Sequence, residues 1–304
     1  MRGRSKLAFL SVVVVLGAVG CFPPGGGVGS IGNPVDNSAG DPLDPTNLPL
    51  GDYHVTQSPQ RGEIDSCQSA FVGGGATGST PWIRSNGTFD VTAKPEVDGS
   101  VSWPTAAFSI TLSGGSRLIS GNGLPVGFTT GVFPIAPTDD AYNFDRNPNS
   151  IATHTVSYSL PANPVAAAAS SCLPMGMIGV ALDGIPIFNG LDAGGRDAVA
   201  HEAQDHCGGH PQQSGVYHYH SISDCLPGAH TSDLIGYAND GFGIYGPIDS
   251  SGHELTNADL DACHGTTSPV LWDGQTVSMY HYVATRAYPY TIGCFRGSPV
   301  TVGA

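Results

Sequence analysis

Two stretches in the second half of the chain match each other and decide the expected fold. Residues 178–188 read IGVALDGIPIF, and residues 235–245 read IGYANDGFGIY. An Asp-Gly pair between two short apolar runs is a strong signal for a β-hairpin. After each hairpin the chain continues through a cysteine, a Tyr-His-Tyr segment and a second cysteine. The matched order predicts an internally duplicated C-terminal half, with one hairpin and one disulfide-bounded loop in each copy.

The cysteines follow the same duplication. Cys207 and Cys225 flank the first Tyr-His-Tyr segment, and Cys263 and Cys294 flank the second. If each copy closes its own loop, the two cysteines that remain after Cys21 pair with each other. Six cysteines permit fifteen connectivities, and the repeat symmetry selects one of them. The predicted disulfides are Cys207–Cys225, Cys263–Cys294 and Cys67–Cys172.

The composition fits a mainly β protein. The 304 residues include 43 glycines and 24 prolines, which cost most in helix interiors, so a helical bundle is excluded. Residues 53–165 alternate short β-type runs with turn signals, which is typical of antiparallel strands in a sandwich-like assembly. We expect little helix, with at most one short helix at residues 166–169. The expected parts are a signal peptide (1–20), a lipobox cysteine with a flexible tether (21–52), a β-rich segment (53–165), the duplicated region (166–297) and a tail (298–304).

The N-terminus predicts export. Arg2, Arg4 and Lys6 precede an apolar run at residues 7–19 that is too short to span a bilayer, as in a signal peptide. The sequence LGAVGC, which ends at Cys21, is similar to a bacterial lipobox, and an ordinary signal peptidase would cut the same bond. Lipidation of Cys21 leaves six cysteines, which suits three disulfides in an oxidising compartment. We expect an exported protein that is either anchored in the cell envelope through Cys21 or extracellular.

The net charge excludes one class of partner. The chain has 25 acidic and 11 basic side chains, a formal net charge of −14. Binding to phosphate backbones needs clustered lysine and arginine, so no nucleic-acid partner is expected. The expected partner is a membrane, reached through the lipid anchor, and a protein or glycan partner stays unidentified.

Several motifs resemble one family of exported bacterial proteins. CGGH at residues 207–210, YHYH at 217–220 and DGFGIYGP at 240–247 resemble the YHYH domain family. Flanking blocks extend the resemblance over about residues 120–297. The family has no established activity, so the resemblance implies an envelope location and a domain boundary but no reaction.

A histidine cluster is the strongest candidate site. His218 and His220 are two residues apart in a segment rich in β-favouring tyrosine, so both imidazoles should lie on one face of a strand. Two imidazoles on one strand face are half of a zinc or copper site. His210 lies in the same disulfide-bounded loop and is the best third ligand, and His206 is a weaker fourth. The predicted cofactor is therefore copper or zinc.

The same histidines also permit a structural role in a half-buried strand. The second copy keeps His281 but has Val283 where His220 maps and Thr266 where His210 maps. If His210 and His220 act together, we expect the second copy to lack both of them. The presence of His281 at the position of His218 instead favours a structural role for the histidine there. The alternative to a metal-binding domain is therefore a non-enzymatic surface module with structural histidines, which presents its disulfide loops to a partner.

Carboxylates give a weaker signal. Asp240 is a possible site carboxylate, although an Asp-Gly pair is mostly turn chemistry. Residues 201–205 read HEAQD, and the zinc-protease motif needs a second histidine where Asp205 stands, so that class is excluded. An enzyme would need an open metal position and a general base, with Asp240 or His206 as the candidates. The sequence leaves open whether the protein is an enzyme.

Overall fold

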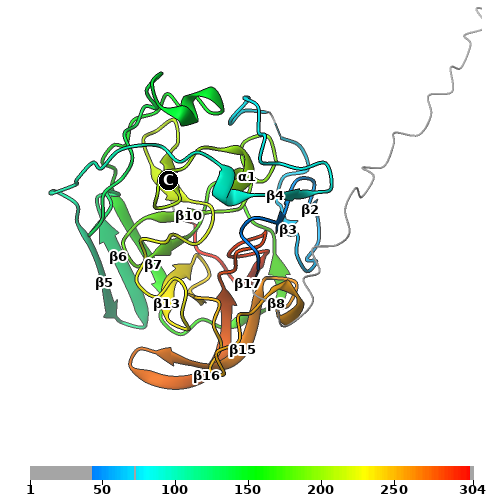
Figure 1. Cartoon of the computed structure of the whole chain (residues 1–304). Coiled ribbons are helices and arrows are strands. Elements are labelled where there is room, and N and C mark those ends of the chain that lie inside the picture. Colours follow the sequence, from blue (N-terminus) through cyan, green and yellow to red (C-terminus); the bar gives the residue numbers. More distant parts are fainter. Residues whose placement is uncertain (1–42, 72, 302–304) are drawn as a thin grey trace, which may run out of the picture. The chain divides into compact units, whose positions relative to one another are not determined.

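The computed structural model describes residues 43–71 and 73–301 (Figure 1). The predicted signal peptide, Cys21 and most of the predicted tether lie outside these residues. Within the described part of the chain, no helix is long and apolar enough to cross a membrane.

One eight-stranded sheet forms the centre of the fold, and its strand order is symmetrical. Strands β9 and β13 pair antiparallel in the middle, and each continues into a hairpin, β9–β10 or β13–β14. Each hairpin then pairs in parallel with the Tyr-His-Tyr strand of its own half, β12 or β16. In spatial order the strands are β11 (Gly209–Pro211), β12 (Tyr217–Tyr219), β10 (Pro186–Phe188), β9 (Met177–Ala181), β13 (Leu234–Ala238), β14 (Gly243–Tyr245), β16 (Gln275–Val283) and β15 (Gly265–Trp272).

A three-stranded antiparallel sheet packs against this large sheet. It consists of β5 (Phe108–Ser113), β6 (Ser116–Gly121) and β7 (Val156–Pro161). Ile119 and Leu160 from the small sheet share a buried apolar cluster with Tyr237 of the large one. The prediction of a mainly β fold with antiparallel sheets and little helix is therefore confirmed. The helical elements are η1 (Val91–Ala93), η2 (Asp140–Asn143), α1 (Ala198–His201) and η3 (Asn257–Asp259).

The prediction of a short helix at residues 166–169 is wrong. These alanines begin strand β8 (Ala166–Ser171), which pairs antiparallel with β17 (Phe295–Gly297). A run this short is a poor helix nucleus in isolation, so pairing with β17 outweighs the helix propensity of alanine. The other small sheets pair β1 (Leu48–Pro49) with β4 (Thr88–Phe89), and β2 (Val55–Thr56) with β3 (Ile64–Asp65).

Three disulfides hold these parts together. They join Cys207 to Cys225, Cys263 to Cys294, and Cys67 to Cys172, the pairs that the repeat alignment predicts. The first two each close a loop around one Tyr-His-Tyr strand.

Candidate metal centre

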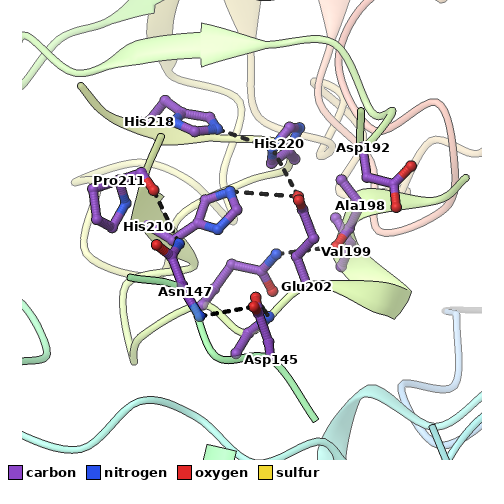
Figure 2. A network of polar contacts seen from close by, with 12 residues as sticks. Asp145, Asn147, Asp192, Ala198, Val199, Glu202, His210, Pro211, His218 and His220 are labelled. Carbon is purple, nitrogen blue, oxygen red and sulfur yellow. Dashed lines mark hydrogen bonds and ion pairs between the residues drawn. The ribbon is translucent and has the colours of Figure 1, made fainter. Parts of the chain in front are cut away.

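Three histidines converge at the end of the large sheet that β11 and β12 form (Figure 2). His210 lies directly opposite His218 in the antiparallel β11–β12 pair. His220 follows one residue after β12 ends, so it lies on the same side as His218. One ring nitrogen from each of the three lies within 4.8 Å of those of the other two, and each residue is only 3% exposed.

The hydrogen bonds of His218 and His220 determine where their ring protons lie. His218 Nδ1 is 3.0 Å from the carbonyl oxygen of Val216, and His220 Nδ1 is 2.6 Å from that of Asn189. A carbonyl only accepts, so both Nδ1 atoms carry the hydrogen and both Nε2 atoms present lone pairs. The two Nε2 atoms are 3.1 Å apart. Two facing lone pairs repel unless a cation lies between them, and Nδ1–H bonds to carbonyls are the usual support of metal-binding imidazoles.

The ring nitrogens of His210 are free to bind a metal ion. Both of its ring nitrogens are buried and have no hydrogen-bond partner among the described residues. A buried polar group without a partner costs about 1–3 kcal/mol, so such groups are rare unless an ion or water satisfies them. A metal ion bound at one ring nitrogen of His210 would remove that cost for that atom.

Glu202 supplies an acidic group that the sequence analysis missed. Its Oε2 atom is 3.5 Å from Nε2 of His210 and 3.5 Å from Nε2 of His220. In the sequence this glutamate stands out only within HEAQD at residues 201–205, which resembles a zinc-protease motif. A usable signal existed: Glu202 precedes Cys207 by five residues, and Ala258 stands at the equivalent position before Cys263. The second half of the sheet thus lacks the acidic residue as well as the two histidines.

The spacing of these donors fits a tetrahedral ion. Two ligand atoms that each lie about 2.0–2.1 Å from a tetrahedral zinc ion are roughly 3.3–3.4 Å apart. The measured separations of 3.1, 3.5 and 3.5 Å lie close to that value. Three of the six donor separations therefore match a tetrahedral ion, and the three histidine nitrogens all lie within 4.8 Å of one another.

The electrostatics keep the imidazoles neutral, which is the form that binds metals. Burial lowers the pKa of His210 and His218 well below the usual histidine value, and lowers the pKa of His220 to about 4. Burial, and then the nearby charge of Asp192, raises the pKa of Glu202 well above its usual value. A buried carboxylate of this kind is stabilised by a cation beside it.

Residues from the preceding part of the chain hold the turn that carries Glu202. Lys94 Nζ donates to the carbonyl oxygens of Val199 (2.6 Å) and Glu202 (2.9 Å), and to the side-chain oxygen of Gln204. Burial lowers the pKa of Lys94 to about 8. Asp145 Oδ2 accepts from the backbone N–H of Ala203, and Trp82 Nε1 donates to the carbonyl of Ala200.

A family model described as YHYH protein matches residues 157–257. Residues 157–257 are a YHYH domain. The match lies inside the region of about residues 120–297 that resembles this family. No curated protein and no solved structure matches the chain. All four donors therefore belong to the YHYH domain, whereas Lys94 and Asp145 precede it.

His206 of the YHYH domain, the predicted fourth donor, lies outside the three-histidine group. Its side chain is exposed and lies outside the group that His210, His218 and His220 form. It lies instead beside Cys207 and Cys225, whose sulfurs are bonded to each other and are not thiolate ligands. His206 precedes β11 in a turn held by Asp205, so nearness in sequence did not bring its ring into the cluster.

Asp240, the possible site carboxylate, is also in the YHYH domain but lies outside the cluster of three histidines. Its oxygens accept from the hydroxyl of Tyr282 (2.6 Å) and from the backbone N–H groups of Gly297 (2.8 Å) and Phe242 (3.3 Å). Its acceptor capacity is used within the fold, as turn chemistry at an Asp-Gly pair predicts.

Proposed function

We propose that the protein is an exported, lipid-anchored cell-envelope protein whose YHYH domain binds one zinc or copper ion. His210, His218 and His220 are its nitrogen donors, and Glu202 is its oxygen donor. The observation that carries the proposal is the 3.1 Å approach of two Nε2 lone pairs beside an imidazole with two unpartnered nitrogens.

The donor set favours zinc over copper. Imidazole nitrogen and carboxylate oxygen suit both ions, but Cu(II) prefers a tetragonal arrangement and zinc a tetrahedral one. The measured donor separations are close to the tetrahedral value.

Export is supported by the covalent structure. Three disulfides persist in oxidising compartments and are rare in the cytosol. Lipidation of Cys21 rests on the lipobox-like sequence alone, and mass spectrometry of membrane-extracted protein tests it. An unmodified thiol at Cys21 on the mature protein would contradict the anchor.

Metal analysis of protein produced in an oxidising periplasm tests the main proposal. We expect one equivalent of zinc per chain after dialysis. Protein that retains neither metal, and takes up neither in a calorimetric titration, would contradict the proposal.

A second candidate function is a surface module with structural histidines. It is favoured by His281, whose Nδ1 is 3.1 Å from the carbonyl oxygen of Met279, the same i−2 contact that His218 makes. A Tyr-His-Tyr histidine therefore has a structural contact in both halves. Under this alternative, His218→Ala and His281→Ala would lower stability equally, and neither metal would bind.

A further inference from the structure

The candidate metal centre lies at one side of an open pocket. The pocket has a volume of about 570 Å³ and is lined by all four donor side chains: Glu202, His210, His218 and His220. Four protein ligands close a structural zinc site, whereas a zinc ion beside an open pocket can take one further ligand and become five-coordinate, as catalytic sites do.

The pocket wall nearest to Glu202 comes from outside the YHYH domain. A Cβ atom on Gly75 would lie 3.0 Å from Oε1 of Glu202 and 3.0 Å from Oδ2 of Asp192, so glycine permits this close approach. Asn147 and Asn149 extend the same wall. On the domain's own side, Gln213 is exposed and lines the pocket.

The charges around the pocket restrict what it can hold. Among the described residues that line it, there is no lysine or arginine. Asp192 is paired with Arg196, whose Nε lies 2.8 Å from its carboxylate, and Asp145 accepts from two backbone N–H groups. No charged side chain is left over to anchor a strongly ionic ligand, so the ion itself is the remaining attachment point.

We infer that the metal centre, with its four protein donors in place, takes from this pocket a small fifth ligand with an oxygen or nitrogen donor, uncharged or singly anionic. This inference rests on the proposed function, since it needs a bound ion. A metal ion that accepts such a ligand has a reactive role and does not serve only to stabilise the fold.

Cobalt substitution with azide as the probe tests the inference. Co²⁺ loaded in place of zinc gives a visible d–d spectrum that reports the coordination sphere. We expect azide to change this spectrum in a saturable titration with one azide per chain. The inference would be overturned if azide left the spectrum of the cobalt-loaded protein unchanged at every concentration from a 100-fold excess over protein up to molar azide. A protein that takes up no cobalt, zinc or copper would instead overturn the proposed function.

A variant of the exposed pocket residue Gln213 tests whether ligands reach the metal ion through this pocket. Gln213→Trp should leave cobalt affinity unchanged and weaken the binding of imidazole, a bulkier probe, at least fivefold more than that of azide. Gln275→Trp, at an exposed site at the start of β16 in the other half of the sheet, is the matched control and should change neither. Equal affinities for both probes in both variants would show that ligands do not enter through this pocket.

Discussion

The two halves of the large sheet share a scaffold but differ in the residues that meet at its ends. In each half, the second tyrosine of the Tyr-His-Tyr strand donates its hydroxyl to the aspartate of the Asp-Gly turn. Tyr219 does so to Asp183 at 2.8 Å, and Tyr282 to Asp240 at 2.6 Å. The first tyrosine of each strand likewise donates to an aspartate two residues before the cysteine, Asp205 in one half and Asp261 in the other. These shared contacts belong to the scaffold.

The register of the outer strands makes the difference between the halves specific. His210 pairs with His218 across β11 and β12, and Thr266 pairs with His281 across β15 and β16. Position for position, the second half replaces the donors His210, His220 and Glu202 by Thr266, Val283 and Ala258. Retained tyrosines beside lost donors show that the scaffold does not need the donors, which supports a separate task for them.

The largest effect is expected from removing a donor. His210→Ala and His220→Ala should each weaken zinc binding at least about 1,000-fold, because a ligand is lost rather than a supporting residue, whose loss costs 10–100-fold. His281→Ala should change zinc affinity less than about twofold. Competition with a chromophoric chelator measures all three. An equal loss of zinc affinity in His281→Ala would contradict a metal centre confined to the first half of the sheet.

Removing one disulfide from each half sharpens the comparison. The sequence separations are 18 residues for Cys207–Cys225 and 31 for Cys263–Cys294. In the loop-entropy model their removal costs about 3 and about 4 kcal/mol of unfolding free energy. Urea unfolding of the paired Cys→Ser variants measures this. Only Cys207→Ser/Cys225→Ser should also weaken zinc binding, and a zinc defect in the other double variant would break the distinction.

The Asp-Gly turns predict an unusual pH dependence of stability. Burial raises the pKa of Asp183 to about 6. In the unfolded chain this carboxyl loses its proton near pH 4, so between about pH 4 and pH 6 the folded state binds more protons. The unfolding free energy should therefore fall as the pH rises through that window, by up to roughly 3 kcal/mol.

Asp183→Asn should remove that contribution and flatten the curve of unfolding free energy against pH. Asp140→Asn, at an exposed position, is the control and should leave the curve unchanged. Burial also raises the pKa of Asp240, so Asp240→Asn should flatten the curve in the same direction. A curve for Asp183→Asn that is parallel to the wild type between pH 4 and 6 would contradict this account.

The smallest effect tests how the preceding segment supports the first half. Lys94→Met removes the bonds to the Glu202 turn and should weaken zinc binding about tenfold, or about 1.4 kcal/mol. If Lys94 acts by positioning Glu202, the loss should largely disappear in a Glu202→Gln background, as a double-mutant cycle would show. An undiminished loss in that background would mean that Lys94 acts only on general stability.

Much of this protein could be read from local patterns. Asp-Gly between apolar runs predicted the hairpins, because such pairs adopt the turn conformations that join antiparallel strands. The matched order of cysteines predicted the pairs Cys207–Cys225 and Cys263–Cys294, because each loop closes around a strand of its own half. The period-two spacing of His218 and His220 predicted that their rings share a side, because side chains alternate along a strand.

Other features were decided only by tertiary contacts. Strand pairing with β17 made residues 166–169 extended, although alanine favours helix. The turn that carries Glu202 accepts a hydrogen bond from Lys94, more than one hundred residues earlier, and no local pattern reports such a contact. His206 is nearer to His210 in sequence than His218 is, yet it stays at the surface. The sequence by itself determined the strands, the turns and the cysteine loops, since these depend on neighbours along the chain. Which side chains meet at one point depends on how separate segments pack, and only the tertiary structure decided that.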